Sequence, residues 1–147
     1  MAGYKFKMQK LLDYKMSIEE EKKNELSLAI KRLEDEKSKL EELKQKQNEM
    51  NNSFQEKTSC GMAVNELKLL ANYIDYYKRS IKEQRIKIKM AEDYLSTCRE
   101  ELIKAIQEKK MMEKLKEIDY RKYLYSEQKK EEKLVDDLVS FKESNKS

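Results

Sequence analysis

The side chains that could do chemistry in this sequence are carboxylates, lysines, arginines, tyrosines and two cysteines, because its 147 residues include no histidine. Histidine is the usual general base near neutral pH and the commonest metal ligand. The 29 acidic residues are mixed with 33 basic ones, as on a solvated helix surface, and no catalytic pair stands out. The two glycines, at positions 3 and 61, cannot form a phosphate-binding loop. We therefore expect no enzymatic activity, no catalytic residues, no cofactor and no metal site.

The two cysteines, Cys60 and Cys98, lack the close spacing of a redox motif or a zinc site. We expect free thiols, which suit a reducing compartment. No window approaches about 18 continuous apolar residues, and the N-terminal stretch has no signal-peptide core. The sequence therefore predicts a soluble cytoplasmic protein that does not insert directly into a membrane.

The most basic stretch is KRSIKEQRIKIK, residues 78–89, which carries six basic side chains and one glutamate. Such a stretch can contact the phosphate backbone of a nucleic acid. However, Ile81, Ile86 and Ile88 give it the pattern of a packed helix, and no aromatic residues lie between the charges to stack on bases. The formal net charge is only +4, so general attraction to polyanions is weak. We expect no nucleic-acid partner, and keep a nucleic-acid-binding arm as the least favoured alternative.

Tyrosines gather in two places that we interpret as protein-binding surfaces. Tyr73, Tyr76 and Tyr77 lie together in ANYIDYYKRS, and three more tyrosines lie within residues 120–125, ahead of LVDDLVSF. Tyrosine presents a large, rigid apolar area with a hydrogen-bonding tip, which suits a protein interface.

Long helices must position these residues, because Ala, Glu, Lys, Leu and Arg make up about half of the chain and proline is absent. The second half carries a heptad pattern whose only strongly polar interruption is Gln84. Disorder would not produce this register, so we predict a helix packed along a narrow stripe. The members of this seam are Leu67, Ile74, Ile81, Ile88, Leu95 and Leu102, then Leu70, Tyr77, Ala91, Cys98 and Ala105, three positions further on.

The first half has a weaker seam, on which Gln47 is an exception and Glu19 and Glu36 would fall. Near the N-terminus the apolar positions are broader than one stripe, which suggests that this end contacts something besides the other helix. The seam members are Leu26, Leu33, Leu40 and Phe54, then Ala29, Leu43 and Met50.

Gly61, flanked by short polar residues, marks the reversal of the chain. The predicted fold is all-α: two long helices forming an antiparallel coiled-coil hairpin, the second longer than the first, in a single domain. We predict helix 1 over about 4–55, a turn at about 57–62, helix 2 over about 63–142 and a disordered tail at 143–147. Counting back from the turn places Tyr4 opposite about residue 115, so the segment from about Lys116 to Phe141 extends past its partner. A heptad seam can also join two chains in parallel, and Gly61 favours the intramolecular hairpin.

Three stretches carry a resemblance to a known family: YKFKMQKLLDYKMSIEEEKKNEL, ELKLLANYIDYYKRSIKEQRIKI and EKLKEIDYRKYLYSEQKKEEKLVDDL. In this order, with the turn between the first two, they resemble the FliJ family of flagellar type III export proteins. The resemblance implies an antiparallel coiled coil similar to the central stalk of rotary ATPases. It also implies three partners: the hexameric export ATPase, the membrane-embedded export gate and the export chaperones. Such a protein would lie peripherally at the cytoplasmic face of the inner membrane.

The resemblance further implies two sets of contact residues. The face that contacts the export gate would comprise Leu43, Met50, Tyr73, Tyr77, Ser80 and Gln84. Because Tyr77 and Gln84 are also seam positions, both roles would require the two helices to be splayed there. The end that holds both termini would contact the ATPase ring through Phe6, Leu11, Leu12, Ile118, Tyr120, Tyr123, Leu124, Leu134 and Leu138.

The leading hypothesis is therefore a non-enzymatic coupling factor of flagellar protein export, whose termini insert into the ATPase ring and whose turn-side half engages the gate. The principal alternative is a general coiled-coil chaperone or scaffold that binds clients through tyrosine and methionine side chains.

Overall fold

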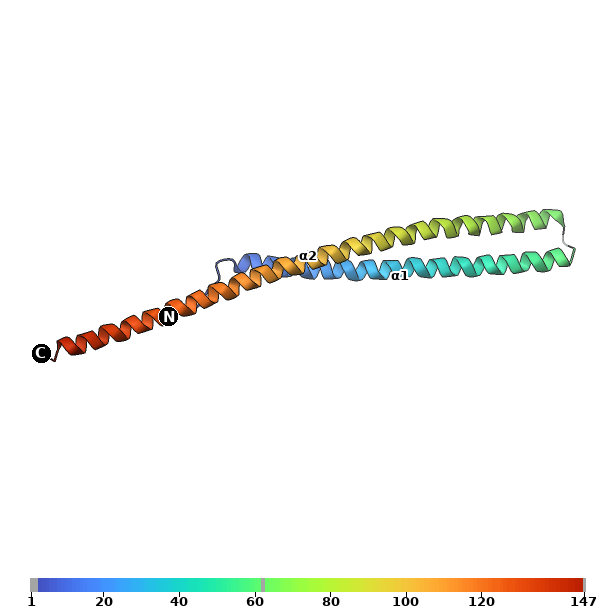
Figure 1. Ribbon diagram of the computed structural model, residues 1–147. Coiled ribbons are helices and arrows are strands. Elements are labelled where there is room, and N and C mark those ends of the chain that lie inside the picture. The colour runs from blue at the N-terminus through green and yellow to red at the C-terminus, as the bar shows by residue number, and fades with distance from the viewer. Residues whose placement is uncertain (1–2, 62, 147) are drawn as a thin grey trace. The chain divides into compact units, whose positions relative to one another are not determined.

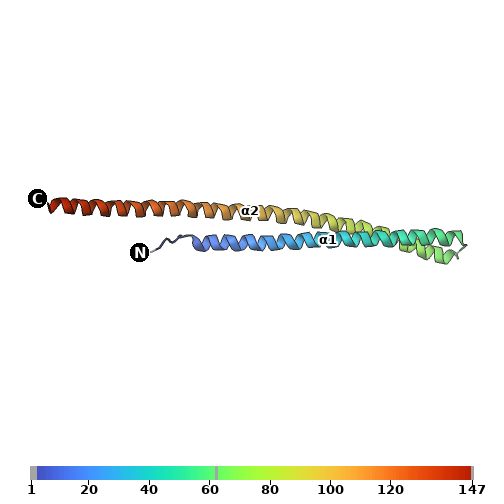
Figure 2. The same ribbon diagram turned by 90° about the horizontal axis from the view of Figure 1, so that it is seen from below.

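The computed structural model describes residues 3–61 and 63–146 and contains two long helices, α1 (Gln9–Ser59, 51 residues) and α2 (Val64–Ser144, 81 residues) (Figure 1). The helices run antiparallel and contact each other, and α2 is the longer (Figure 2). The predicted fold class is confirmed: the chain is all-α, with two long antiparallel helices in contact.

The helix bounds differ from the predicted ones at both ends of α1. The helix begins at Gln9, where the sequence predicted a start near Tyr4, because the preceding residues carry the Tyr4 ring onto Tyr120 and Tyr123. It continues past the predicted end at Gln55 to Ser59, where hydroxyls cap the last carbonyls: Ser59 Oγ donates to the Gln55 carbonyl at 2.9 Å.

The C-terminus of α2 also lies further along than predicted. Glu143 and Ser144, which the sequence placed in a disordered tail, belong to the helix, and the Asn145 amide donates to the Phe141 carbonyl at 3.1 Å. Met1, Ala2, Met62 and Ser147 lie outside the described residues, and with them parts of the predicted turn and tail.

The reversal between the helices depends on Gly61, as predicted. Its φ of 76° lies in the left-handed region, which L side chains adopt only with strain. A Cβ built at this position meets no atom within 4 Å, so the requirement for glycine comes from backbone conformation and not from space. The connection starts later than the predicted residue 57, and the Ala63 carbonyl accepts the amides of Glu66 and Leu67 at the start of α2.

The contacts within the chain divide into two units. The terminal unit comprises Met1–Glu21 and Ile103–Ser147, and the turn-side unit comprises Lys22–Leu102. Each unit contains a part of α1 and a part of α2.

In the turn-side unit, the predicted heptad seam forms the core. Ala29, Leu95 and Cys98 are buried together, with Leu26 and Leu33 packed against them. The small side chains of Ala29 and Cys98 leave room for the leucines of the opposite helix, as in knobs-into-holes packing. Cys98 is therefore a buried free thiol, whereas Cys60, at the end of α1, is an exposed one.

In the terminal unit, the core is smaller and more polar. Leu12, Ala105 and Met112 are buried, but so is Glu19. The predicted seam position of Glu19 is confirmed, and its partner across the seam is a lysine. Beyond Tyr123, the described residues of α2 are exposed, apart from the half-buried Glu127.

Replacing Gly61 with alanine should destabilise the hairpin by about 1 kcal/mol, because alanine must adopt the left-handed conformation at a cost of that order. Urea denaturation followed by circular dichroism measures the loss. Gly3→Ala is the matched control, since no left-handed φ constrains that glycine. Equal urea midpoints for both variants would contradict this role of Gly61.

Candidate functional site

Within residues 3–61 and 63–146, no group of three or more His, Cys, Asp or Glu side chains is placed to hold a metal ion. Over the same residues, no helix has both the length and the apolar character needed to cross a membrane. The candidate functional sites described below are surfaces for contact with other proteins, one in each unit.

The N-terminal segment of the terminal unit is fixed to α2 through Tyr4. The Tyr4 ring meets Tyr120 edge-on, with centroids 5.0 Å apart, and lies 5.3 Å from Tyr123. Its hydroxyl donates to Asp119 Oδ2 at 2.9 Å and approaches the Lys116 carbonyl at 3.3 Å. Removal from water, together with the bond to Asp119, raises the pKa of Tyr4 to about 12. Tyr4 therefore remains a protonated donor across the physiological pH range.

Tyr4 thus lies close to the place predicted for it, opposite residue 115, but the sequence did not indicate an aromatic cluster. In the sequence, apolar residues repeat every seven positions as far as residue 105, whereas the apolar residues after Met112 do not continue this repeat. In the structure the spacing does continue, with Lys109, Met112, Lys116 and Tyr123 as its less exposed members. The pattern was hidden because lysines occupy two of these positions.

The side chains of Lys109 and Lys116 each interact with a polar side chain of α1. Lys109 Nζ lies 2.5 Å from Glu19 Oε2, and Lys116 Nζ donates to Gln9 Oε1 at 2.7 Å. Lys15, one turn before Glu19, binds Glu108, the residue before Lys109, at 2.9 Å. The hydrogen bond with Glu19 raises the pKa of Lys109, and the bond from Lys15 lowers the pKa of Glu108. Specific polar pairs therefore fix the register where an apolar seam would ordinarily do so.

All nine residues predicted to contact the ATPase ring lie in the terminal unit, but they do not form one surface. Leu12 is only 4% exposed and belongs to the core in this conformation, and its contact with the ring remains a prediction. Phe6 and Tyr123 are half-buried near Tyr4. The remaining six are exposed: Leu11, Ile118, Tyr120, Leu124, Leu134 and Leu138.

Two groups of exposed apolar residues in the terminal unit extend beyond the contact residues predicted from the sequence, of which Ile118, Leu134 and Leu138 are members. Met111, Leu115 and Ile118, at helical spacing, line a shallow hollow of about 230 Å³ together with Lys114. Val135, Val139 and Phe141 extend the exposed face around Leu134 and Leu138. The signal for the second group was the stretch LVDDLVSF. The first group lies before the last contact of α2 with Tyr4, at Tyr123, and the second group gives α2 an apolar face beyond it.

The six residues predicted to contact the export gate all lie in the turn-side unit. Tyr73 is exposed, Ser80 is half-buried, and Leu43, Met50 and Tyr77 are half-buried on the seam. Gln84 is only 5% exposed, and its amide donates to the Glu36 carbonyl at 2.9 Å and to the Glu36 carboxylate. The helices are therefore closed at Gln84, and its side chain does not belong to a surface in this conformation.

The exposed part of this candidate site lies on α2 near the turn. Leu69, Tyr73 and Tyr76 are all exposed, and the Tyr76 ring packs edge-on against Tyr77 with centroids 5.4 Å apart. Leu69 was not assigned from the sequence, although it is one turn before Tyr73. These three side chains form an aromatic and aliphatic patch held in place by the seam residue Tyr77.

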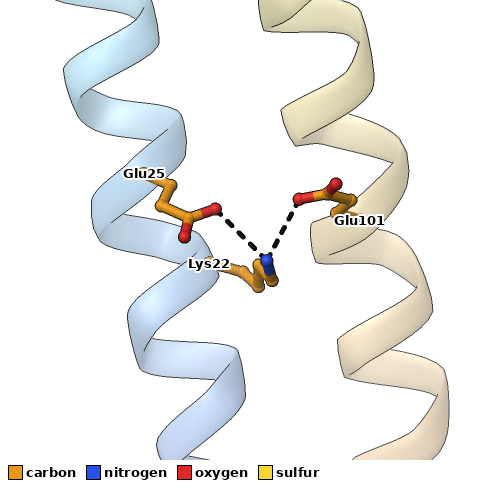
Figure 3. A network of polar contacts seen from close by, with 3 residues as sticks. All are labelled: Lys22, Glu25 and Glu101. Atoms are coloured by element: carbon orange, nitrogen blue, oxygen red, sulfur yellow. Dashed lines mark hydrogen bonds and ion pairs between the residues drawn. The ribbon is translucent and has the colours of Figure 1, made fainter.

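A charged layer lies at the other end of the turn-side unit. Lys22 Nζ donates to Glu25 Oε2 at 3.3 Å on its own helix and to Glu101 Oε2 at 3.1 Å on α2 (Figure 3). The hydrogen bond with Glu101 is the largest cause of the raised pKa of Lys22, and the hydrogen bond with Glu25 is the next largest. This layer joins α1 to α2 through opposite charges.

Residues 4–147 match a protein-family model described as flagellar FliJ protein. The chain is also similar to a solved structure, described as that of a candidate YscO homologue, CT670, from Chlamydia trachomatis. The TM-score is 0.79, and the match covers 95% of this chain and 94% of that chain. The sequence identity is 18%, so the similarity is one of fold. Among curated proteins, none matches this chain.

The Glu19–Lys109 pair should respond non-additively to substitution. Glu19→Leu or Lys109→Leu alone removes one member of the ion pair and leaves the charge of the other on the seam, so each should lower the thermal midpoint. The double variant should recover most of the loss, because two leucines can pack at adjacent seam positions. Thermal denaturation of all four proteins measures the coupling. Additive losses would show that the two side chains act independently.

Acid should weaken the turn-side unit through Glu36. The hydrogen bond from Gln84 holds the pKa of Glu36 below its ordinary value, so the stabilisation is present above about pH 4.3 and is lost as the pH falls through the lowered pKa. Urea midpoints between about pH 6 and pH 3 should fall less steeply for Glu36→Gln than for the wild type. Parallel pH profiles would contradict this assignment.

Proposed function

This chain belongs to the FliJ family of flagellar proteins, and we propose that it couples the export ATPase to the export gate of the flagellar type III apparatus. The family is a non-catalytic component of that apparatus. In the proposal, the terminal unit binds the hexameric ATPase ring, the turn-side unit binds the membrane-embedded gate, and the protein assists export chaperones. It would act in the cytoplasm, peripherally at the inner membrane.

The observation that carries the proposal is the uncovered apolar face of α2 in the terminal unit. Leu134 is 62% exposed and Phe141 is 64% exposed, and Leu124 and Leu138 are nearly as open. A single solvated helix is only marginally stable in water. Apolar residues gathered on such a helix gain about 25 cal/mol for each Å² that a partner covers. This favours a role for the segment in docking to another protein, for which the ATPase ring is the partner that the family implies.

Polar contacts around Tyr4 support the same assignment. They fix the N-terminal segment to α2 next to the start of the exposed face, so Phe6 and Leu11 lie within the same unit as Leu124. A partner that surrounds this unit would meet both helices. Coupling then requires that the conformational states of the ring differ in their affinity for this surface, since only a differential contact can shift an equilibrium.

The turn-side patch of Leu69, Tyr73 and Tyr76 supports a second contact. These side chains are exposed to solvent. Tyrosine is enriched among the residues that contribute most to the binding energy of protein interfaces. We assign this patch to the export gate, together with Ser80 beside it. Leu43, Met50, Tyr77 and Gln84 would support the patch from the seam and would contact the gate only after local opening of the helices.

A general coiled-coil chaperone would use the same exposed tyrosines and methionines. The two functions differ in selectivity: a coupling factor has one partner for each unit, whereas a general chaperone binds many clients weakly through both. Substitutions confined to one unit therefore separate them.

The triple variant Leu134→Ser, Leu138→Ser and Phe141→Ser should weaken binding to the export ATPase at least tenfold, since each change removes apolar area from the interface. The matched control is Leu69→Ser with Tyr76→Ser, which should leave ATPase binding unchanged and weaken binding to the gate. The measurements are ring formation, the rate of ATP hydrolysis and the affinity for the isolated cytoplasmic domain of the gate.

Circular dichroism should show unchanged helix content in both variants, because every substituted side chain is exposed. If the wild type changed neither ring formation nor hydrolysis, the coupling function would be wrong. Equal losses for both partners in both variants would favour the general chaperone.

A further inference from the structure

One flank of the seam in the turn-side unit carries a row of positive charges that the proposed function does not use. Lys78 and Arg85 each follow a seam residue of α2, and Lys82 lies between them on the same face of the helix. All three are exposed. We call these three side chains the cationic flank.

The cationic flank surrounds a hollow with an apolar floor. The hollow has a volume of about 430 Å³ and is lined by Gln47, Lys78, Ile81, Lys82 and Arg85. Ile81 is buried on the seam and forms the floor, while Gln47 contributes an amide from α1. Its lining therefore combines three cations, one neutral polar group and one aliphatic group, and contains no carboxylate.

The chain does not neutralise these charges itself. Several other cations of the turn-side unit form ion pairs, among them Lys22 with Glu101 at 3.1 Å and Lys89 with Asp93 at 3.3 Å. Over the described residues, no ion pair joins Lys78, Lys82 or Arg85 to a carboxylate. The flank is therefore a group of three positive charges that lie close together on one face of α2 without an ion pair of their own.

The opposite helix adds to the charge. Lys37 and Lys44 follow the seam residues Glu36 and Leu43 of α1, and in an antiparallel pair these positions face the ones that follow the seam on α2. Lys44 has a carboxylate nearby, Glu41, at 3.8 Å on its own helix. Like charges on facing flanks destabilise a coiled coil, whereas opposite charges across the helices, as in Lys22 and Glu101, stabilise it. A bound anion would remove this repulsion.

We propose that the cationic flank binds an acidic helical segment of a partner protein. Along α2, Lys82 and Arg85 lie about 6 and 10 Å from Lys78. Carboxylates at positions i, i+4 and i+7 of another helix have the same spacing, and an apolar residue between them would meet Ile81. The guanidinium of Arg85 can bind a carboxylate through two parallel hydrogen bonds.

Other anionic ligands fit this surface less well. Bases of a single-stranded nucleic acid need aromatic side chains to stack on, and none lines the hollow. Insertion into a membrane surface needs outward apolar side chains within the site, whereas Ile81 lies on its floor and the exposed Ile86 and Met90 are outside its lining. The flank is also separate from the patch assigned to the gate, because Tyr73 and Ser80 precede seam residues and so lie on the other side of the seam.

The test uses an 18-residue alanine-based helical peptide with glutamate at positions i, i+4 and i+7 around a central leucine. A peptide with glutamine in place of glutamate is its control. Fluorescence anisotropy at about 0.15 M salt measures binding to the wild type and to two triple variants. The first is Lys78→Glu, Lys82→Glu and Arg85→Glu, and the second, with the same change in net charge, is Lys110→Glu, Lys122→Glu and Lys133→Glu in the terminal unit.

We expect the glutamate peptide to bind the wild type and the terminal-unit variant equally, and the flank variant at least tenfold more weakly. The glutamine peptide should not bind. The flank variant should also have a higher thermal midpoint than the wild type, because the carboxylates introduced at positions 78 and 85 would face Lys37 and Lys44 and attract them. If the variant is more stable than the wild type but binds the peptide more weakly, unfolding cannot explain the weaker binding.

Absence of binding to the wild type, or equal losses in both triple variants, would overturn the proposal. The wild type could also bind a 20-nucleotide single-stranded RNA, or vesicles containing phosphatidylglycerol, more tightly than it binds the glutamate peptide. If the flank variant then lost that binding, the proposal would be overturned in favour of a nucleic acid or a membrane.

Discussion

Two helices with few apolar residues can form a folded structure only if they bury those residues against each other along one narrow line. In this chain 42% of the residues are charged, and the seam between α1 and α2 provides the buried apolar side chains. Ala29 and Cys98 are almost completely buried because their small side chains allow the helices to approach, and Leu95 then fills the space beside them. Gly61 makes this pairing possible within one molecule, since its left-handed conformation returns the chain along α1.

The character of the seam differs between the two units. In the turn-side unit it is mostly aliphatic, with Gln84 and Glu36 as a hydrogen-bonded polar layer. In the terminal unit the equivalent positions hold Glu19, Lys109 and Lys116, whose charges are satisfied across the helices. Buried polar pairs contribute less net stability than apolar packing but strongly disfavour shifted registers, because a shift would leave charges without partners. The terminal unit therefore combines a fixed register with exposed apolar groups such as Leu134.

Much of this fold could be predicted from the sequence, because aliphatic side chains repeated every seven residues are typical of helices packed side by side. Leu95 and Cys98 were assigned to the seam on spacing alone, and Gly61 was assigned to the turn as the only glycine in the interior of the chain. The polar seam was harder to predict. Lys109 and Lys116 look like surface residues until the positions of Glu19 and Gln9 on the other helix are known. Helix starts depend on tertiary contacts in the same way, as Tyr4 shows.

The candidate surfaces were only partly predictable, since exposure depends on where the partner helix ends. Leu12 and Leu11 are adjacent leucines, yet one is buried and the other is open, because the helix turns by about 100° for each residue. The exposed face around Leu138 followed from the unequal lengths of the helices. The closed state of Gln84 did not, because it depends on a hydrogen bond to α1 that no local pattern records.

The intramolecular pairing of α1 with α2 can be measured directly with spin labels at Leu28 and Thr97, two exposed positions of the turn-side unit. A Cys60→Ser background leaves Cys98 as the remaining native thiol, and it is buried. Electron paramagnetic resonance on protein diluted into an excess of unlabelled chain should give a distance of about 20 Å, since packed helix axes lie about 10 Å apart. A distance near 100 Å, the rise of one uninterrupted helix between these residues, would contradict the hairpin and the surfaces derived from it.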